Sequence, residues 1–537
     1  MRTVLATLVM VLLVLPCLAQ GELINIGKAR VILKISGYTT APEKVYLPVK
    51  DERQEVEYPD YLDVKKDAYG NSYIEVDGNY SYEFNVLVDA SKPRIAGDQQ
   101  FPSKIDEKEY EKYLTNSNFI TPSDPEIKKK ALAIVGETNS TLEAIKRLNE
   151  WVNEFVEYDA NESKYIQDSS TVLKTRRGVC SEYANLYTAL ARSIGIPTRI
   201  ASGIAYTRAG WTTHAWAESL IETNTGGTTR HIWIPVDPTS GEAGTRNAMI
   251  IKFYSAPNLL PEGIKNPKVL SVQKEEYKLQ IETDASISET TLAPRQHFTL
   301  NLLITNKGNS FLMPTYFIQK TIGVQSLDRV SKTIVLPPGQ TRSISWELIA
   351  PFGERERYTI FLKGPQLEKD FAITVDPSLS VVKTSKIEIK EVFAYSESGT
   401  LIINVKVLNK GNELSPTLVR AETDIGTKQT TITLSPGEEK EIHFNFPAEP
   451  GEYHFTVEAI AENETDSTSG KAQVNKPLSF EQSLLNQIIH YLRTYHVYYF
   501  LVLFTIGATL IILVYPTIKK PKKPFEEKGE WHKLVRV

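Results

Sequence analysis

Three residues along this chain of 537 residues could together carry out nucleophilic catalysis. The chain has only two cysteines, Cys17 and Cys180, and Cys180 stands immediately before a predicted helix, where the helix dipole favours a thiolate. His214 has the side chain of a general base, and Asp237 ends the next predicted strand, where its carboxylate could orient the imidazole. A thiol, a base and an orienting carboxylate predict acyl transfer through a thioester.

The surrounding pattern predicts the elements that must position these side chains. Apolar residues recur at three- and four-residue steps over 142–155, which indicates an amphipathic helix packed on a core. A second helix is predicted over 181–194, and strands follow in RIASGIAY, HAWAESLI and HIWIPVD. Alternation in the middle strand places His214, Trp216 and Glu218 on one face.

The negative oxygen of a tetrahedral intermediate needs hydrogen-bond donors that are fixed in advance. The backbone N–H of Cys180 is the expected first donor. Gln167 and Trp151 are upstream candidates for the second, although Trp151 belongs to the apolar face of its helix and Gln167 lies in a polar segment. Arg176 and Arg177 are expected to add positive charge near the thiol.

Four other residues of this region have two interpretations each. His231 could join the cysteine, the histidine and the aspartate in a tetrahedral metal site, but paired ligand spacings such as C-x-x-C or H-E-x-x-H do not occur, so we expect no metal and no cofactor. Trp216 and Trp233 could line a substrate groove, although aromatic side chains on strands are more often packed. Glu218 is either a more distant carboxylate of the site or a solvated strand residue.

Three segments in this order resemble the transglutaminase-like superfamily, a papain-related fold with a Cys-His-Asp triad. They are GVCSEYANLYTALARSIGIPTR, the H-x-W-x-E pattern that starts at His214, and WIPVDPT, and the resemblance covers about residues 123–255. The resemblance implies that Cys180 is the nucleophile, that His214 is the general base and then the acid, and that Asp237 orients His214.

The same resemblance implies an enzyme that attacks the carboxamide or peptide carbonyl of a protein or peptide. Release of the thioester by water would make the enzyme a cysteine protease or amidase, whereas release by an amine would make it a crosslinking transamidase, and the residues leave both open. The alternative is a catalytically inactive domain that serves as a surface binding or adhesion scaffold. Because all three positions hold the chemically competent residue, we favour the enzyme.

Both ends of the chain predict export and membrane anchoring. Arg2, an apolar stretch and a small-residue exit predict a signal peptide over 1–19. The uncharged run 497–515 approaches the roughly 20 residues that cross a bilayer, which predicts one transmembrane helix. A juxtamembrane amphipathic segment over 476–496 precedes it and a basic cytoplasmic tail over 516–537 follows it. The protein is therefore expected at the cell membrane, with its N-terminal domains and its substrate on the extracytoplasmic side.

The rest of the chain is predicted to be rich in strands. An N-terminal β-domain over 20–115 precedes the catalytic domain over 116–260. Farther on, LLITNKGN returns as VKVLNKGN about 100 residues later, and VLPPGQTRSISWEL returns as TLSPGEEKEIHFNF. This repeat predicts two immunoglobulin-like β-sandwiches, over 270–376 and 380–475. We expect them to act as spacers or to contact other surface proteins.

The predicted fold class is multidomain α+β. Its papain-like core has helices packed on an antiparallel sheet, and an N-terminal β-domain, two C-terminal β-sandwiches and one transmembrane helix flank that core. The chain has 61 basic and 65 acidic residues and a formal net charge of -4. This balance removes the main electrostatic reason to expect a nucleic-acid partner.

Overall fold

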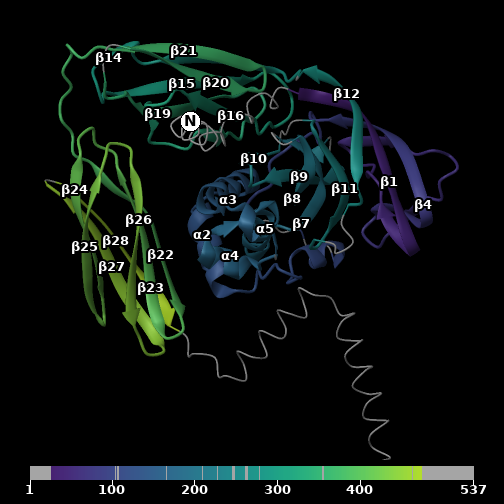
Figure 1. The fold of residues 1–537 in the computed structure, drawn as a ribbon, viewed down its shortest axis with the longest axis horizontal. Coiled ribbons are helices and arrows are strands. Elements are labelled where there is room, and N and C mark those ends of the chain that lie inside the picture. Colours follow the sequence, from purple (N-terminus) through teal and green to yellow (C-terminus); the bar gives the residue numbers. More distant parts are fainter. Residues whose placement is uncertain are drawn as a thin grey trace, which may run out of the picture. The chain divides into compact units, whose positions relative to one another are not determined.

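The computed structural model describes residues 26–474 apart from gaps at 103–104, 106–107, 165, 208–209, 226–227, 245–247, 260–263, 277, 354–355 and 463. The predicted signal peptide, juxtamembrane segment, transmembrane helix and tail lie outside the described residues. Within the described ranges, no helix is both long and apolar enough to cross a membrane. These ranges form a multidomain, mostly β protein with one small group of helices (Figure 1).

The N-terminal sheet contains a strand that comes from much later in the chain. Its early strands are β1 (Ile26–Tyr46), β2 (Gln54–Glu57), β3 (Lys65–Lys66) and β4 (Ser72–Asp89). The sheet order is β12-β1-β4-β2, in which β12 (Pro267–Glu276) pairs antiparallel with β1. The predicted boundary at residue 270 places most of β12 in the first sandwich, whereas β12 belongs to the N-terminal sheet. The alternating pattern of a strand specifies a half-buried face but not the strand that pairs with it.

The central part of the chain packs helices on an antiparallel sheet. The helical elements are η1 (Lys108–Tyr113), α2 (Pro125–Val135), α3 (Thr141–Phe155), η2 (Ala160–Lys164), α4 (Ser169–Thr175) and α5 (Cys180–Ser193). The sheet has the order β10-β9-β8-β7-β11, with β7 (Thr198–Thr207), β8 (Gly210–Thr225), β9 (Thr228–Asp237), β10 (Glu242–Ala243) and β11 (Ile250–Ala256). Two short strands, β5 (Glu157–Tyr158) and β6 (Arg177–Gly178), pair in parallel beside the helices.

Local chemistry explains where the helices begin. The Asp124 side chain accepts a hydrogen bond from the N–H of Glu126 at 2.9 Å, ahead of Pro125 at the first helical position. Ser140 Oγ accepts from the N–H of Glu143 at 2.9 Å. The predicted helices over 142–155 and 181–194 are confirmed as α3 and α5, which each begin one residue earlier than predicted.

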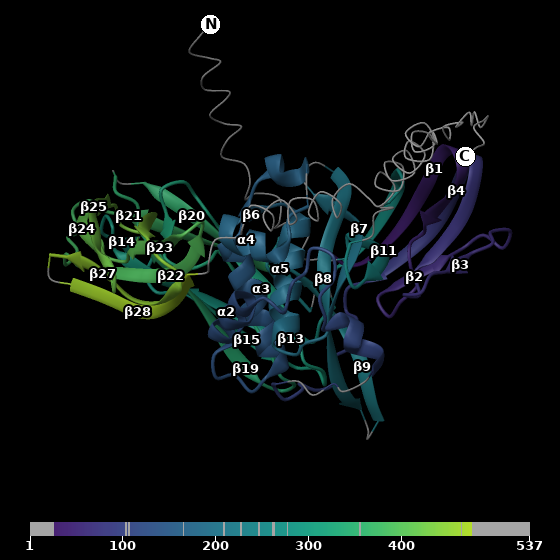
Figure 2. The ribbon, with the colours of Figure 1, turned by 90° about the horizontal axis from the view of Figure 1, so that it is seen from below.

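The two faces of this sheet pack against different parts of the chain. Ala217, Ile232 and Ile234 are buried in the helical core, whereas Trp216 and Ile250 belong to a cluster on the other face. Figure 2 shows the helices on one side of β7 and β8 and the N-terminal strands beyond the other. The alternation predicted for β8 is therefore confirmed.

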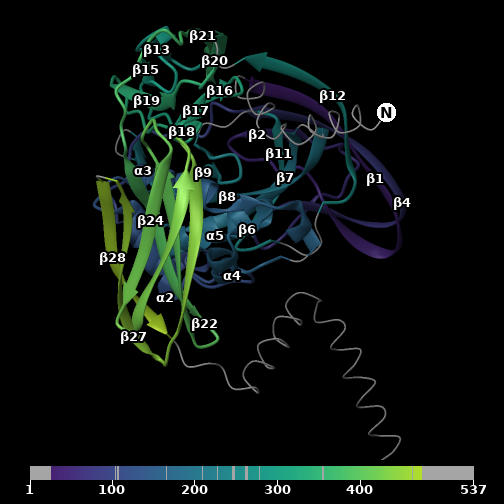
Figure 3. The same ribbon diagram turned by 60° about the vertical axis from the view of Figure 1, so that its left-hand side comes forward.

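Two β-sandwiches follow the central part (Figures 1 and 3). The first pairs the sheet β13-β15-β19-β17 with the sheet β14-β21-β20-β16-β18. Its strands are β13 (Ile281–Ile287), β14 (Thr291–Leu292), β15 (His297–Asn306), β16 (Thr315–Lys320), β17 (Gln325–Ser326), β18 (Ser331–Thr333), β19 (Thr341–Ile349), β20 (Arg357–Gly364) and β21 (Leu367–Val375). The second pairs β22-β23-β26 with β25-β24-β27-β28. Its strands are β22 (Ile387–Glu397), β23 (Thr400–Asn409), β24 (Ser415–Thr423), β25 (Gly426–Leu434), β26 (Glu439–Pro447), β27 (Gly451–Ala461) and β28 (Glu464–Val474).

The sequence repeat corresponds to a repeated hydrogen-bond pattern in the two sandwiches. Asn306 and Asn409 are both fully buried. Nδ2 of Asn306 donates to the carbonyls of Ser310 and Leu336 at 2.8 and 3.0 Å. Nδ2 of Asn409 donates to the carbonyls of Glu413 and Leu434 at the same two distances, 2.8 and 3.0 Å. Each asparagine thus links the turn that follows its own strand to a second, more distant segment of the same sandwich. The immunoglobulin-like classification of the two sandwiches stays a prediction.

Candidate active site

The candidate nucleophile begins a helix. Cys180 is the first residue of α5, is partly buried, and follows Val179, whose backbone is extended. A helix begins with backbone N–H groups that point toward its N-terminus and with the positive end of its dipole. Both features favour negative charge at this position, either on sulfur or on a developing oxyanion.

A buried carboxylate holds the turn that leads into the nucleophile. Glu182 is fully buried, and its Oε2 accepts hydrogen bonds from the Val179 N–H and the Ser181 hydroxyl, both at 2.9 Å. Its Oε1 accepts from the N–H of Gln167 at 3.1 Å. A Cβ on Gly178 would lie 2.2 Å from the Glu182 Cβ, so only glycine fits there. We did not single out Glu182 from the sequence, although a glutamate at the third helical position is a known capping pattern.

The candidate base and its orienting residue lie on neighbouring strands, β8 and β9. Nε2 of His214 is 2.7 Å from Oδ2 of Asp237, and the two side chains are 14% and 2% exposed. The other carboxylate oxygen of Asp237 accepts a hydrogen bond from the N–H of Thr239 at 3.1 Å. The carboxylate is therefore fixed by the turn that ends β9, and it fixes the imidazole in turn.

His214 connects the carboxylate to the thiol. Cys180 is close enough to the His214 side chain to act on its pKa, and because Asp237 engages Nε2, Nδ1 is the ring nitrogen left for the thiol. Burial by itself would lower the pKa of His214, but the charge of Asp237 and the hydrogen bonds to Asp237 and Cys180 raise it to about 10. A protonated imidazole beside a sulfur stabilises the thiolate, the form that attacks a carbonyl.

The three predicted residues thus come together in one cluster, which we call the triad: Cys180, His214 and Asp237. A family model described as the Transglutaminase-like superfamily matches residues 128–238, a range that includes the whole triad. The chain contains a transglutaminase-like domain.

Two solved structures are similar to the chain. One is a candidate cysteine protease from Cytophaga hutchinsonii, with 16% identity and a TM-score of 0.33, covering 47% of this chain and 91% of that chain. The other is red sea bream transglutaminase, with 11% identity and a TM-score of 0.22, covering 84% of this chain and 93% of that chain. A comparison with curated protein sequences found no match. TM-scores this low do not establish a common arrangement of the whole chain.

The two upstream candidates for a second oxyanion donor in the transglutaminase-like domain are engaged elsewhere. Nε2 of Gln167 donates to Glu162 at 2.9 Å, and its Oε1 accepts from the hydroxyl of Thr175 at 3.1 Å. Trp151 stacks on Phe155, with ring centroids 4.1 Å apart. Trp151 thus packs against the core, as its place on the apolar helix face indicates, the amide of Gln167 is held by other polar side chains, and the second donor stays unassigned.

A residue that the sequence did not single out lies beside the nucleophile. Tyr158 is the register partner of Gly178 in the β5–β6 pair, and its ring centroid is 6.4 Å from that of Tyr183. Its side chain is 58% exposed. Burial, and then the proximity of Cys180 and Glu182, raise the pKa of Tyr158. No sequence pattern marks this tyrosine, because only a two-residue parallel bridge makes it a neighbour of the thiol.

The two arginines expected to add positive charge near the thiol are paired with carboxylates. Nη2 of Arg176 donates to Glu391 at 2.7 Å, and its Nη1 contacts Glu441, both in the second sandwich. Arg177 lies 3.5 Å from the carboxylate of Glu157. The positive charge of both side chains is therefore largely offset, which the sequence could not indicate because Glu391 and Glu441 lie far along the chain.

The strand face that carries His214 continues into a buried ion cluster of the transglutaminase-like domain. Trp216, only 2% exposed, stacks against His214 at 6.1 Å between ring centroids. Glu218 is 5% exposed and accepts hydrogen bonds from Arg199 at 2.8 Å and from Lys252 at 2.7 Å. Burial alone would raise the pKa of Glu218, but these two cations lower it to about 2. Glu218 is thus not a solvated strand residue.

The remaining aromatic and metal-site candidates are packed into the domain. Trp233 lies under the guanidinium of Arg199, whose Cζ is 4.0 Å from the ring centroid. Trp216 and Trp233 also line a cavity of about 150 Å³, in which no triad residue takes part. His231 is 3.7 Å from Glu222 and packs its ring against Tyr110 at 5.2 Å. Among the described residues, no group of three or more histidine, cysteine or acidic side chains could hold a metal ion.

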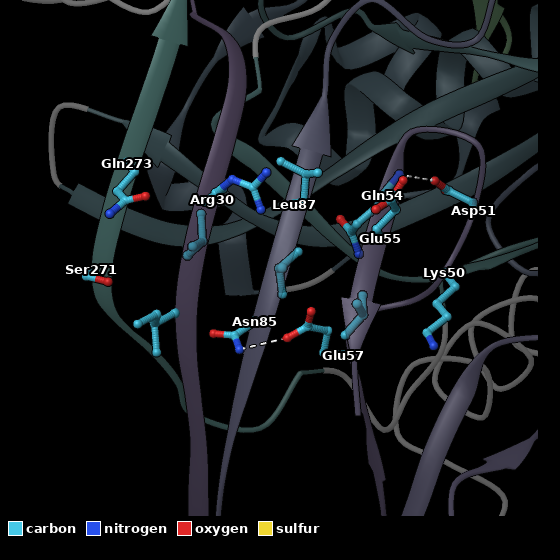
Figure 4. A pocket seen from close by; sticks show the side chains of 14 residues that line it. Arg30, Lys50, Asp51, Gln54, Glu55, Glu57, Asn85, Leu87, Ser271 and Gln273 are labelled. Atoms are coloured by element: carbon cyan, nitrogen blue, oxygen red, sulfur yellow. Dashed lines mark hydrogen bonds between the residues drawn. The ribbon is translucent and has the colours of Figure 1, made fainter. Parts of the chain in front are cut away.

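A cavity of about 550 Å³ lies on the N-terminal sheet (Figure 4). Polar side chains of β1, β2, β4 and β12 line it, including Arg30, Glu55 and Gln273. Among the lining residues, Nδ2 of Asn85 donates to Glu57 at 2.9 Å and the N–H of Gln54 donates to Asp51 at 2.8 Å. No triad residue lines this cavity, so it does not extend the candidate active site.

Proposed function

We propose that this protein is a thiol acyltransferase, acting as a cysteine protease, amidase or transamidase on the carboxamides of proteins or peptides. The observation that carries the proposal is the triad: a thiol at the start of a helix, beside an imidazole that a buried carboxylate binds at 2.7 Å. The match of residues 128–238 to the transglutaminase-like superfamily supports the same chemistry.

The proposed reaction has two steps. The thiolate of Cys180 attacks the carbonyl carbon, a C–S bond forms, and the backbone N–H of Cys180 donates to the oxyanion. The imidazolium of His214 gives its proton to the departing nitrogen, and the C–N bond breaks to leave a thioester. Water or an amine then attacks the thioester, His214 accepts the proton of the attacking group, and the thiolate is released. Asp237 stays ionised and holds the imidazole throughout.

The proposed setting is the outer side of a membrane. Its support is the sequence alone: the export signal predicted over 1–19 and the single apolar run over 497–515. The substrate and any partner of the two sandwiches would then be extracytoplasmic proteins or peptides. Protease accessibility of the transglutaminase-like domain in intact cells tests this orientation.

The reactivity of Cys180 tests the proposed chemistry. The full chain is treated with iodoacetamide across a range of pH, and peptide mass spectrometry follows alkylation of Cys180 in the wild type and in His214→Ala. We expect fast alkylation below pH 7 that becomes slow in the variant. If the alkylation rate instead rises with pH as for an ordinary thiol, with a pKa of about 8.5, and is the same in His214→Ala, the inactive scaffold becomes the better explanation.

A second assay separates hydrolysis from amine transfer. A peptide carboxamide is incubated with the protein in the presence and absence of a labelled primary amine, with Cys180→Ala as the control. Incorporation of the label identifies a transamidase, whereas release of free acid at the same rate with or without the amine identifies a hydrolase. Product in the Cys180→Ala control would show that the activity does not belong to this site.

A further inference from the structure

The second β-sandwich contacts the segment that leads into the candidate nucleophile. Arg176, four positions before Cys180, ends α4 in the left-handed region with φ 59° and ψ 22°. Its guanidinium lies over the ring of Phe155, 4.4 Å from the centroid, and is only 12% exposed. Glu391 of β22 and Glu441 of β26 bind its two terminal nitrogens. Because a carboxylate binds each of the two terminal nitrogens, both the position and the orientation of the guanidinium are fixed.

The backbone of the same segment holds the two short strands beside the site. The carbonyl of Arg176 accepts a hydrogen bond from the N–H of Glu157 at 2.7 Å, and the carbonyl of Gly178 accepts from the N–H of Asp159 at 3.0 Å. These bonds set the register that places Tyr158 opposite Gly178. A displacement of Arg176 would therefore move both the turn before Cys180 and the strand that carries Tyr158.

The rest of this interface is both apolar and charged. Phe393 of β22 is 5% exposed and belongs to the same core as Phe155, with ring centroids 6.2 Å apart. Lys390, its neighbour on β22, bonds to Glu154 at 3.0 Å and to Glu439 at 2.7 Å. The sandwich thus has several contacts with the helices, but among those described here only the contact through Arg176 reaches the turn before the nucleophile.

We propose that Arg176 is a positioning residue, through which Glu391 and Glu441 of the second sandwich hold the turn before Cys180 in its reactive geometry. The inference rests on the proposed role of Cys180 as the nucleophile. It assigns the second sandwich a part in the chemistry that a spacer would not have.

Charge and geometry predict opposite effects, which makes the proposal testable. Replacing Glu391 and Glu441 by glutamine removes two negative charges and leaves Arg176 positive, so a purely electrostatic effect on Cys180 would favour the thiolate and speed its alkylation. Loss of positioning would slow alkylation. The direction of the change therefore separates the two effects.

The test uses the full chain and three variants. Glu391→Gln/Glu441→Gln removes the charged partners of Arg176, and Arg176→Gly removes its side chain while leaving a residue that accepts φ 59° without strain. Lys390→Met is the matched control, because it breaks one ion pair of the same interface, with Glu154, and one within the sandwich, with Glu439, without touching Arg176. Thermal unfolding confirms that each variant is folded.

The measured quantities are the alkylation rate of Cys180 and hydrogen exchange of the amides of Glu157 and Asp159. We expect the double variant and Arg176→Gly to slow alkylation about tenfold or more, because small displacements at a reacting atom are costly. Both variants should also speed exchange of the two amides, which donate to this turn. Lys390→Met should change the alkylation rate by less than about twofold.

The outcomes separate this inference from the proposed function. If His214→Ala slows alkylation but the double variant does not, the inference is overturned and the proposed function stands. Equal slowing in the double variant and in Lys390→Met would also overturn it, because the effect would then belong to the interface as a whole. If the alkylation rate is the same in His214→Ala as in the wild type, the proposed function fails. Unchanged amide exchange in the double variant overturns the positioning inference, whatever the result for His214→Ala.

Discussion

At the scale of single residues, the protonation state of His214 governs the proposed chemistry. Burial favours the neutral imidazole, whereas Asp237 and Cys180 favour the charged form strongly enough to raise the pKa of His214 to about 10. A group with a raised pKa keeps its proton through the neutral range and loses it only as the pH rises through about 10. His214 can therefore both stabilise a thiolate and protonate a departing amine at neutral pH.

Asp237→Asn removes the negative charge of this side chain while keeping its shape. Without the carboxylate, burial lowers the pKa of His214, so the pH above which the acylation rate falls should move to a lower value. The rate of acylation should fall by about 10³-fold or more, because the imidazole also loses its orientation. The measurement is the pH dependence of kcat/KM for a peptide carboxamide. A fall at the same pH as in the wild type would contradict this account of His214.

At the scale of elements, the turn before α5 depends on the packing of Gly178 against Glu182. A side chain at Gly178 would come within 2.2 Å of the Glu182 Cβ, and the hydrogen bonds from Val179 and Ser181 prevent Glu182 from moving away. The start of the helix is thus set by a glycine and a buried glutamate two positions on either side of Cys180.

Gly178→Ala should therefore displace the nucleophile. We expect the free energy of unfolding to fall by about 1–3 kcal/mol, the usual cost of overpacking, and the alkylation rate of Cys180 to fall with it. Gly451→Ala is the control, because the nearest atom to its Cβ would be Cε2 of Tyr453 at 3.8 Å, an ordinary van der Waals distance. Chemical denaturation and alkylation measure the two effects. A Gly178→Ala protein as reactive as the control would show that this turn tolerates displacement.

The buried ion cluster behind His214 predicts a pH dependence of stability. The pKa of Glu218 is lowered from 4.5 to about 2, so its charge stabilises the fold fully above pH 4.5, and this contribution is lost as the pH falls toward 2. Glu218→Gln should lower Tm strongly at pH 7 and much less near pH 2. Glu55→Gln, at an exposed strand position, should change Tm little at either pH. Equal Tm losses at both pH values would contradict the assignment.

At the scale of the whole molecule, both sandwiches touch the segments that carry the triad. The hydroxyl of Thr333 in the first sandwich donates to the carbonyl of Gly241 at 3.2 Å, and the N–H of Gly241 donates to the carbonyl of Asp237 at 2.9 Å. The second sandwich binds Arg176, ahead of Cys180. Each sandwich therefore contacts a segment beside a triad residue, while its expected role as a spacer or as a contact for other surface proteins stays a prediction.

The repeated asparagines predict that each sandwich has its own stabilising turn. Asn306→Ala and Asn409→Ala each leave buried carbonyls without their donor, so each should cost about 2–4 kcal/mol. Hydrogen exchange should show faster opening of β15 in the first variant and of β23 in the second. Asn301→Ala, at an exposed position of β15, is the control. If either substitution alone speeds exchange in both sandwiches, the prediction that each asparagine stabilises only its own sandwich is contradicted.

Local patterns were sufficient to predict much of the domain that carries the triad. The helices α3 and α5, the alternation of β8 and the order of Cys180, His214 and Asp237 all depend on residues close together in the chain. The repeat of the sandwiches was also visible, because two copies of one buried turn keep the same residues. These features are encoded by spacing and residue type, which a sequence displays directly.

The tertiary structure alone decided which distant segments meet. The pairing of β12 with β1, the position of Tyr158 beside the thiol and the binding of Arg176 by Glu391 and Glu441 join residues that no local pattern connects. A charged or alternating segment indicates that a partner or a buried face is needed, but many segments of the chain could supply it. Packing of the whole chain selects among them, and that selection determined the surroundings of the predicted triad.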